Sequence, residues 1–157
     1  MPPTILGSRR LAWPAEAQCA AFAAALAVRP GIADAAIELR GPLGAGKTTF
    51  ARHLLRALGV AGRIKSPSYA LMEPYRLAAG GAAAHLDFYR FADPHEWIDA
   101  GLREVYAAPG LKIAEWPDKA GDLLPPPDLR LTLEVGDDGG RSVTAEALTP
   151  LGLALLG

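Results

Sequence analysis

Residues 41–48 of this chain read Gly-Pro-Leu-Gly-Ala-Gly-Lys-Thr, an uninterrupted match to the pattern G-x-x-x-x-G-K-[ST]. The pattern constrains the fold strongly, because such a loop functions only between a strand and a helix. The chain supplies both neighbours. Residues 36–40 are typical of a short strand, and residues 48–58 place apolar side chains along one side of a helix that Gly59 ends. We therefore predict a phosphate-binding loop for a nucleoside triphosphate.

The fixed positions of this loop have separate expected roles. Glycine allows backbone geometries forbidden to other residues, and it lets successive N–H groups approach phosphate oxygens. Lys47 supplies a positive charge for the β- and γ-phosphates, and the Thr48 hydroxyl is suited to Mg²⁺. The predicted nucleotide-binding residues are Gly41, Leu43, Gly44, Ala45, Gly46, Lys47, Thr48 and Thr49.

The size and composition of the chain favour one cytoplasmic domain spanning residues 1–157. A single cysteine, Cys19, permits no internal disulfide and fits a reducing compartment. Residues 17–28 are uncharged, but Glu16 precedes them where a secretory signal would carry basic residues, so we expect a helix there. No apolar run approaches the roughly 20 residues of a membrane span, and we predict no membrane association.

The periodicity of the sequence predicts alternating strands and helices. We expect helices over residues 14–28, 48–58 and 93–106, and strands over residues 36–40, 69–75, 82–87, 111–115, 129–135 and 142–147. Asp93, Pro94 and Glu96 are placed to start the third helix with a capping box. This order predicts an α/β fold, a P-loop NTPase-like three-layer sandwich with a mostly parallel central sheet and antiparallel edge strands.

Two carboxylates end predicted apolar strands: Asp87 and Glu115. Ligands of such sheets bind beyond the carboxyl ends of the strands, where the phosphate loop also lies. We assign Asp87 to Mg²⁺ opposite Thr48 and Glu115 to the attacking water, with the exchange of the two roles as the alternative. A carboxylate that merely caps a turn would give the same pattern.

Other polar residues give weaker signals. The segment 66–69, Ser-Pro-Ser-Tyr, is a candidate γ-phosphate-sensing loop, and Ser68 is a further candidate for the metal. His85 fits packing or hydrogen bonding better than chemistry, and Trp116 is more typical of a core. The chain has no Asn and only one Gln, so elements that guanine-specific proteins use are absent, and ATP is favoured over GTP.

Basic residues gather in one part of a chain whose net charge is −1. Residues 39–72 contain no acidic residue but hold Arg40, Lys47, Arg52, Arg56, Arg63 and Lys65. Apart from Lys47, this group is either a solvated rim or a contact for an anionic partner, and both interpretations stay open. Arg52 and Arg56, four residues apart on one helix, are our candidates for a partner contact.

Four ordered blocks of the chain resemble the TsaE family, also called YjeE, of bacterial P-loop ATPases in tRNA threonylcarbamoyladenosine biosynthesis. The blocks are GPLGAGKTTF at 41–50, SPSYALMEPY at 66–75, HLDFYR at 85–90 and IAEWPD at 113–118. The first block is generic, whereas the other three in this order are specific. The chain departs from the family pattern at Pro42, at Ser68 (usually Thr) and at Asp118 (usually Glu).

The resemblance implies an ATP- and Mg²⁺-dependent hydrolase that is slow alone and acts with the TsaD and TsaB proteins on the modification of tRNA. It implies Lys47 and Thr48 on phosphate and metal, Asp87 on the metal, Ser68 near both, and Glu115 as the catalytic carboxylate. It also makes tRNA a candidate partner of the Arg52–Arg56 pair.

Two other interpretations remain. A small-metabolite kinase of the shikimate-kinase type has a similar loop but needs an arginine-rich lid, and residues 97–124 hold only one arginine, Arg103. A nucleotide-gated binding module, in which hydrolysis is incidental, would differ mainly in not needing Glu115.

Overall fold

The computed structural model describes residues 4–65, 67, 72–93, 95 and 101–157. Within these residues a seven-stranded sheet runs in the order β1-β7-β6-β2-β5-β4-β3. The strands are β1 (Gly7–Trp13), β2 (Ala36–Arg40), β3 (Met72–Arg76), β4 (Ala82–Asp87), β5 (Leu111–Glu115), β6 (Leu129–Val135) and β7 (Arg141–Ala147).

The middle of the sheet is parallel and its two sides are antiparallel. β6, β2, β5 and β4 pair in parallel, whereas β3 pairs antiparallel to β4, and β7 pairs antiparallel to both β6 and β1. Strands β7 and β3 therefore run opposite to the other five. The predicted fold class is confirmed. The sheet has as many antiparallel as parallel pairings, because β7 pairs antiparallel with the strands on both of its sides.

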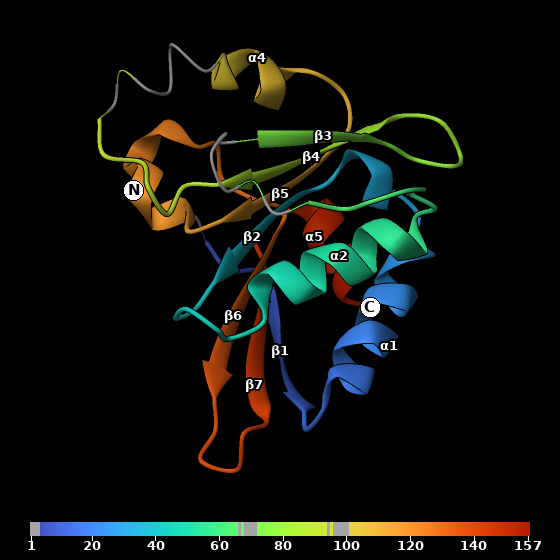
Figure 1. Ribbon diagram of the computed structural model, residues 1–157, viewed down its shortest axis with the longest axis vertical. Helices are drawn as coiled ribbons and strands as arrows, with labels where there is room; N and C mark the ends of the chain where they lie inside the picture. The colour runs from blue at the N-terminus through green and yellow to red at the C-terminus, as the bar shows by residue number, and fades with distance from the viewer. Residues whose placement is uncertain (1–3, 66, 68–71, 94, 96–100) are drawn as a thin grey trace.

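Helices cover both faces of the sheet. They are α1 (Glu16–Ala27), α2 (Lys47–Ala57), α4 (Leu102–Ala107), α5 (Pro150–Leu156) and the 3₁₀ helices η1 (Ile32–Asp34) and η2 (Pro117–Leu123). Figure 1 shows α1 and α2 side by side, and α4 at the end of the sheet where β3 and β4 lie. The arrangement is the predicted layered sandwich.

Alternating strand residues build a separate core on each face. In β5, Ile113 packs in the cluster that contains α1 and α2, and its neighbour Ala114 packs in the cluster that contains α4 and η2. Because successive strand side chains point to opposite faces, strands buried on both sides must be apolar throughout. All five residues of β5 are buried, which fits this rule apart from Lys112 and Glu115.

The predicted core elements are confirmed with small changes of boundary. Strands 36–40, 82–87 and 111–115 match β2, β4 and β5, and helix 48–58 matches α2 shifted by one residue. Helix 14–28 is α1 without its outer residues, and the late hairpin is β6 and β7. The sequence analysis did not predict β1 or α5.

Two predictions fall partly outside the described residues. The strand predicted over 69–75 is seen as β3, and its residues 69–71 are not described. The helix predicted over 93–106 is seen as α4, and residues 94 and 96–100, including the Glu96 of the proposed capping box, are not described. Asp93 does accept the N–H of His95 at 2.9 Å, as a capping Asp would.

Candidate functional site

Residues 41–46 connect β2 to α2 through a backbone that requires glycine. Gly41 has φ of +141°, and a Cβ there would lie 2.4 Å from the Leu133 carbonyl oxygen. Gly46, at φ of +103°, is the N-cap of α2, and its carbonyl accepts the N–H of Phe50 at 2.9 Å. L side chains rarely adopt this region. The glycines of the motif are thus explained by close approach and by left-handed turns.

Lys47 is held inside this loop. Its Nζ atom donates to the Gly41 carbonyl and to the Pro42 carbonyl at 3.3 Å, and it lies 3.7 Å from the ring centroid of Trp116. Burial lowers the pKa of Lys47, while Glu115, Asp87 and, less strongly, Asp118 act to raise it. An aromatic face attracts a cation at this distance. The ammonium group is therefore positioned before any anion binds.

Trp116 reaches Lys47 because of an unusual backbone conformation. It is the non-glycine residue with positive φ, +54°, in the described part of the chain. This conformation is uncommon for a bulky residue, and it lies directly after Glu115 and before Pro117. Its ring also contacts Tyr89, with centroids 5.0 Å apart. A side chain expected in a core thus also covers the phosphate-loop lysine.

Glu115, at the end of β5, is connected directly to Thr48. The Thr48 hydroxyl lies 2.9 Å from both Glu115 carboxylate oxygens. Glu115 is only 2% exposed, and its Oε2 atom also lies 2.6 Å from Nε2 of His85 on β4. A hydroxyl that can bind Mg²⁺ and a buried carboxylate therefore meet beside the phosphate loop.

Asp87, at the end of β4, is the register partner of Glu115. Its Oδ1 atom accepts the Tyr89 N–H at 2.9 Å. Burial raises the pKa of Asp87 and the nearby Glu115 raises it further, whereas the Tyr89 N–H, His85 and Lys47 oppose the shift. The two predicted carboxylates are thus adjacent, as expected for the ends of parallel strands.

These residues surround one pocket. It is lined by Leu43, Gly44, Ala45, Gly46, Lys47, Thr48, Thr49, Asp87, Tyr89, Glu115, Trp116 and Arg141. The described residues contain no group of three His, Cys, Asp or Glu side chains able to hold a metal by themselves. Mg²⁺ commonly takes only one or two carboxylates and completes its shell with phosphate oxygens and water. A hydroxyl and two carboxylates fit that requirement.

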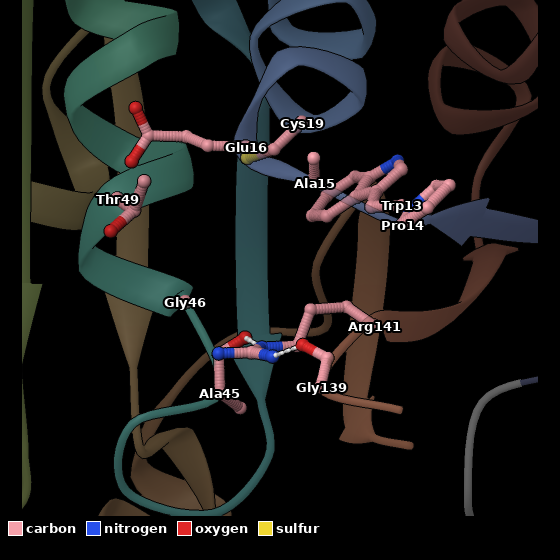
Figure 2. A pocket seen from close by; sticks show the side chains of 10 residues that line it. All are labelled: Trp13, Pro14, Ala15, Glu16, Cys19, Ala45, Gly46, Thr49, Gly139 and Arg141. Carbon is pink, nitrogen blue, oxygen red and sulfur yellow. Dashed lines mark hydrogen bonds between the residues drawn. The ribbon is translucent and has the colours of Figure 1, made fainter. Parts of the chain in front are cut away.

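A second pocket lies beside the first (Figure 2). It is lined by Trp13, Pro14, Ala15, Glu16, Cys19, Ala45, Gly46, Thr49, Gly139 and Arg141. The two pockets share Ala45, Gly46, Thr49 and Arg141. Together the two pockets form one trough along the phosphate loop, which runs from the carboxylates to the start of α1 and the β6–β7 hairpin.

Arg141 separates the two pockets and holds the loop. Its Nε atom donates to the Ala45 carbonyl at 2.9 Å, its Nη2 to the Gly44 carbonyl at 3.1 Å, and its Nη1 to the Gly139 carbonyl. Figure 2 shows this guanidinium reaching from β7 to the loop. Arg141 is also the register partner of Trp13 on β1. β1, the loop and β7, three distant parts of the chain, therefore lie together around Arg141.

The structure brings together the predicted site residues it describes, except that Gly41 lies at the base of the loop, outside the pocket lining. Ser68 lies outside the described residues, so its role stays a prediction. Of the basic residues, Arg40 pairs with Glu38 at 3.3 Å and Arg56 donates to the Val60 carbonyl at 2.9 Å. These contacts are structural, and an additional contact of Arg52 and Arg56 with a partner stays a prediction.

The sequence analysis missed Arg141 and the second pocket. A basic residue after a predicted turn carries no local signal of its target, because that target depends on how β7 is placed in the sheet. His85 was expected to pack or hydrogen-bond, and it does both. The block 113–118 did place Trp116 next to a site carboxylate, which was the available signal for its role.

No helix in the part of the chain that the structure describes is long and apolar enough to cross a membrane.

The fold and the loop define the class of protein: a P-loop NTPase-like α/β domain. A family model described as "Threonylcarbamoyl adenosine biosynthesis protein TsaE" matches residues 13–143. The chain belongs to the TsaE family.

Individual relatives agree. A Haemophilus influenzae protein named tRNA threonylcarbamoyladenosine biosynthesis protein TsaE is 39% identical over 116 residues, which are 74% of this chain and 72% of that protein. A Bacillus subtilis protein of the same name is 30% identical over 146 residues, 89% of this chain and 87% of that protein. The crystal structure of Bacillus subtilis YdiB matches with a TM-score of 0.79 at 23% identity, covering 98% of this chain and 94% of that one.

Proposed function

We propose that the chain binds ATP, with the phosphates on the loop of residues 41–48. The observation that carries the proposal is the direct hydrogen bonding of Thr48 to Glu115, beside a Lys47 ammonium group that loop carbonyls already hold in position. Loop amides and a lysine neutralise phosphate charge, and a threonine hydroxyl next to a carboxylate suits a nucleotide-bound Mg²⁺. When bound, Mg²⁺ would supply charge neutralisation at the β- and γ-phosphates.

The contacts favour one division of labour between the two carboxylates. Glu115 lies against Thr48, whereas no hydrogen bond joins Asp87 to Thr48 among the described residues. We therefore assign Glu115 with Thr48 to the metal, and Asp87 to orienting the attacking water. This is the exchange of the roles that the sequence analysis preferred. The raised pKa of Asp87 fits a group that accepts a proton more readily than an ordinary aspartate.

The second pocket is the proposed place of the nucleoside. It continues from the phosphate loop and is walled by Trp13 and Pro14, with the Cys19 sulfur and the Thr49 side chain on the α1–α2 side (Figure 2). Nucleoside sites are commonly apolar clefts with few polar groups. In this arrangement Arg141 lies at the boundary between base and phosphates.

The biological role that we propose follows the family. The relatives are named as tRNA threonylcarbamoyladenosine biosynthesis proteins, and we infer the same modification for this chain. Hydrolysis is slow in isolation and is stimulated in a complex with the TsaD and TsaB proteins, with tRNA bound to the complex and the chain in the cytoplasm. The family and the single described arginine of residues 101–124 give no support to the kinase alternative.

The test is ATP turnover by the purified chain with Mg²⁺, alone and with TsaD, TsaB and tRNA, and with Lys47→Ala as the control. We expect slow release of phosphate to water that rises with the partners and disappears in the variant. Turnover that does not change when the partners are added would favour the interpretation as a nucleotide-gated binding module. Transfer of phosphate to a small acceptor would instead revive the kinase interpretation.

A further inference from the structure

His85 is a buried polar residue that the proposed reaction does not use. It is 0% exposed on β4, two residues before Asp87, and faces the same side of the sheet. Its Nε2 atom lies 2.6 Å from Oε2 of Glu115. Among the described residues its other ring nitrogen, Nδ1, has no hydrogen-bond partner. A buried imidazole with one nitrogen left unpaired is costly, so filling space does not explain it.

The contact itself determines which nitrogen carries the hydrogen. An ionised carboxylate only accepts hydrogen bonds, so at 2.6 Å the Nε2 atom must donate to Glu115. In the neutral imidazole Nδ1 is then the acceptor, which is the atom left without a partner. The interaction with Glu115 is therefore the polar contact that the imidazole makes within the described residues.

Two groups hold the Glu115 carboxylate from different elements. His85 binds Oε2 from β4, while Thr48, at the start of α2, donates from 2.9 Å. Thr48 lies equally close to both carboxylate oxygens, so the imidazole on Oε2 is the contact that fixes the rotation of the carboxylate group. Outer partners of this kind orient carboxylates that bind metals.

We propose that His85 is a positioning residue that fixes the orientation in which the Glu115 carboxylate faces the Mg²⁺-nucleotide. The proposal rests on the proposed function, because it takes Glu115 as the metal carboxylate. It adds that the preference of the site for the metal-bound nucleotide depends on a side chain that touches neither metal nor phosphate.

The experiment measures the affinity for ADP by calorimetry, once with Mg²⁺ and once with EDTA. The ratio of the two dissociation constants is the Mg²⁺-dependent gain. His85→Leu removes the donor but keeps apolar volume, and it should lower this gain by about 10- to 100-fold with the affinity in EDTA nearly unchanged. His85→Gln keeps an N–H donor of similar reach and should restore most of the gain.

Two further variants test whether His85 acts on the Mg²⁺-dependent gain through Glu115. His85→Leu in a Glu115→Gln background should cause no additional loss, because the histidine acts through that carboxylate. Lys112→Met is the matched control: Lys112 is buried on neighbouring β5 and donates to the Ala108 carbonyl, outside the pocket lining. It should lower the melting temperature without changing the Mg²⁺-dependent gain.

The outcomes separate the proposal from the function it rests on. An unchanged gain in His85→Leu, or equal losses of affinity with Mg²⁺ and with EDTA, would overturn the positioning role while leaving the site intact. A wild-type chain without any Mg²⁺-dependent gain would refute the metal assignment and this role together. If His85→Leu does not fold, the comparison of His85→Gln with the shorter His85→Asn decides, since only the former reaches Glu115.

Discussion

The two pockets along the phosphate loop are built in different ways. The carboxylate pocket takes its acidic residues from the ends of neighbouring parallel strands, β4 and β5. The second pocket takes its walls from the start of α1 and from antiparallel β1 and β7. Asp87 and Glu115 line the first pocket alone, whereas Arg141, which binds loop carbonyls, lines both. The proposed chemistry and the proposed nucleoside recognition thus fall on different parts of the sheet.

Removal of Lys47 should affect both pockets, because it removes the charge on which the phosphates of any nucleotide depend. We expect Lys47→Ala to weaken ATP binding by about 100-fold or more, close to 3 kcal/mol, in calorimetric titrations. Unchanged binding would remove the phosphate-loop interpretation of residues 41–48.

Substitutions of the two carboxylates of the first pocket should have different effects. Asp87→Asn should keep the Mg²⁺-dependent gain in affinity but lower turnover by about 100-fold, within the usual range for a lost proton acceptor. Glu115→Gln should lose the gain. The measurement is ADP affinity with Mg²⁺ and with EDTA, together with phosphate release. The opposite pattern would restore the roles that the sequence analysis preferred.

Substitution of Arg141, which lies where the two pockets meet, tests the contact that holds the loop. Arg141→Met removes three hydrogen bonds to backbone carbonyls, so we expect nucleotide affinity to fall by about 10-fold, equally with Mg²⁺ and with EDTA. Arg10→Met is the matched control, since Arg10 is exposed on adjacent β1 and its side chain donates to Ser142 at 3.4 Å. Equal affinities for both variants would show that the loop keeps its shape without this contact.

The ionisation of Asp87 should also appear in stability. Its pKa is raised in the folded state by burial, so the ionised form destabilises the fold at neutral pH. Asp87→Asn should therefore show a small rise in Tm at pH 7. The advantage should shrink as pH falls through the raised pKa toward the unfolded value near 3.8. Thermal melts at several pH values check this, and a variant less stable at pH 7 would contradict it.

The smallest effect concerns Cys19 in the second pocket. Burial and, less strongly, Glu16 raise the pKa of its thiol to about 11, so at pH 8 only about 0.1% is thiolate, against about a quarter of an ordinary thiol. Alkylation by iodoacetamide should be slow, and ATP should slow it a further few-fold. A rate that ATP leaves unchanged would place the nucleoside elsewhere.

The carboxylate side was predictable because its information is local. β4 and β5 are short apolar runs that end on Asp87 and Glu115, and the loop motif fixes which end of the sheet is used. Even so, the sequence could not show that Thr48 meets Glu115. That contact depends on the order of strands, which places β5 between β2 and β4.

The Arg141 side was not predictable for the opposite reason. β1 has a polar run, Ser-Arg-Arg, followed by an apolar run, Leu-Ala-Trp, so it lacks the alternation that predicts a strand, and it pairs with a strand more than a hundred residues away. A single sequence contains no sign of that pairing. The position of Arg141 opposite Trp13, two residues that line the second pocket, follows from that pairing.

This pairing has a consequence for synthesis of the chain. β1 joins β7 through register partners from Gly7↔Ala147 to Trp13↔Arg141, so β1 is synthesised well before the strand with which it pairs. Contacts so distant in sequence form late, after their loop-closure entropy is met. The second pocket, which Trp13 and Arg141 both line, therefore forms only after β7 has been made, and a chain that stops short of β7 lacks this wall of the proposed nucleoside site.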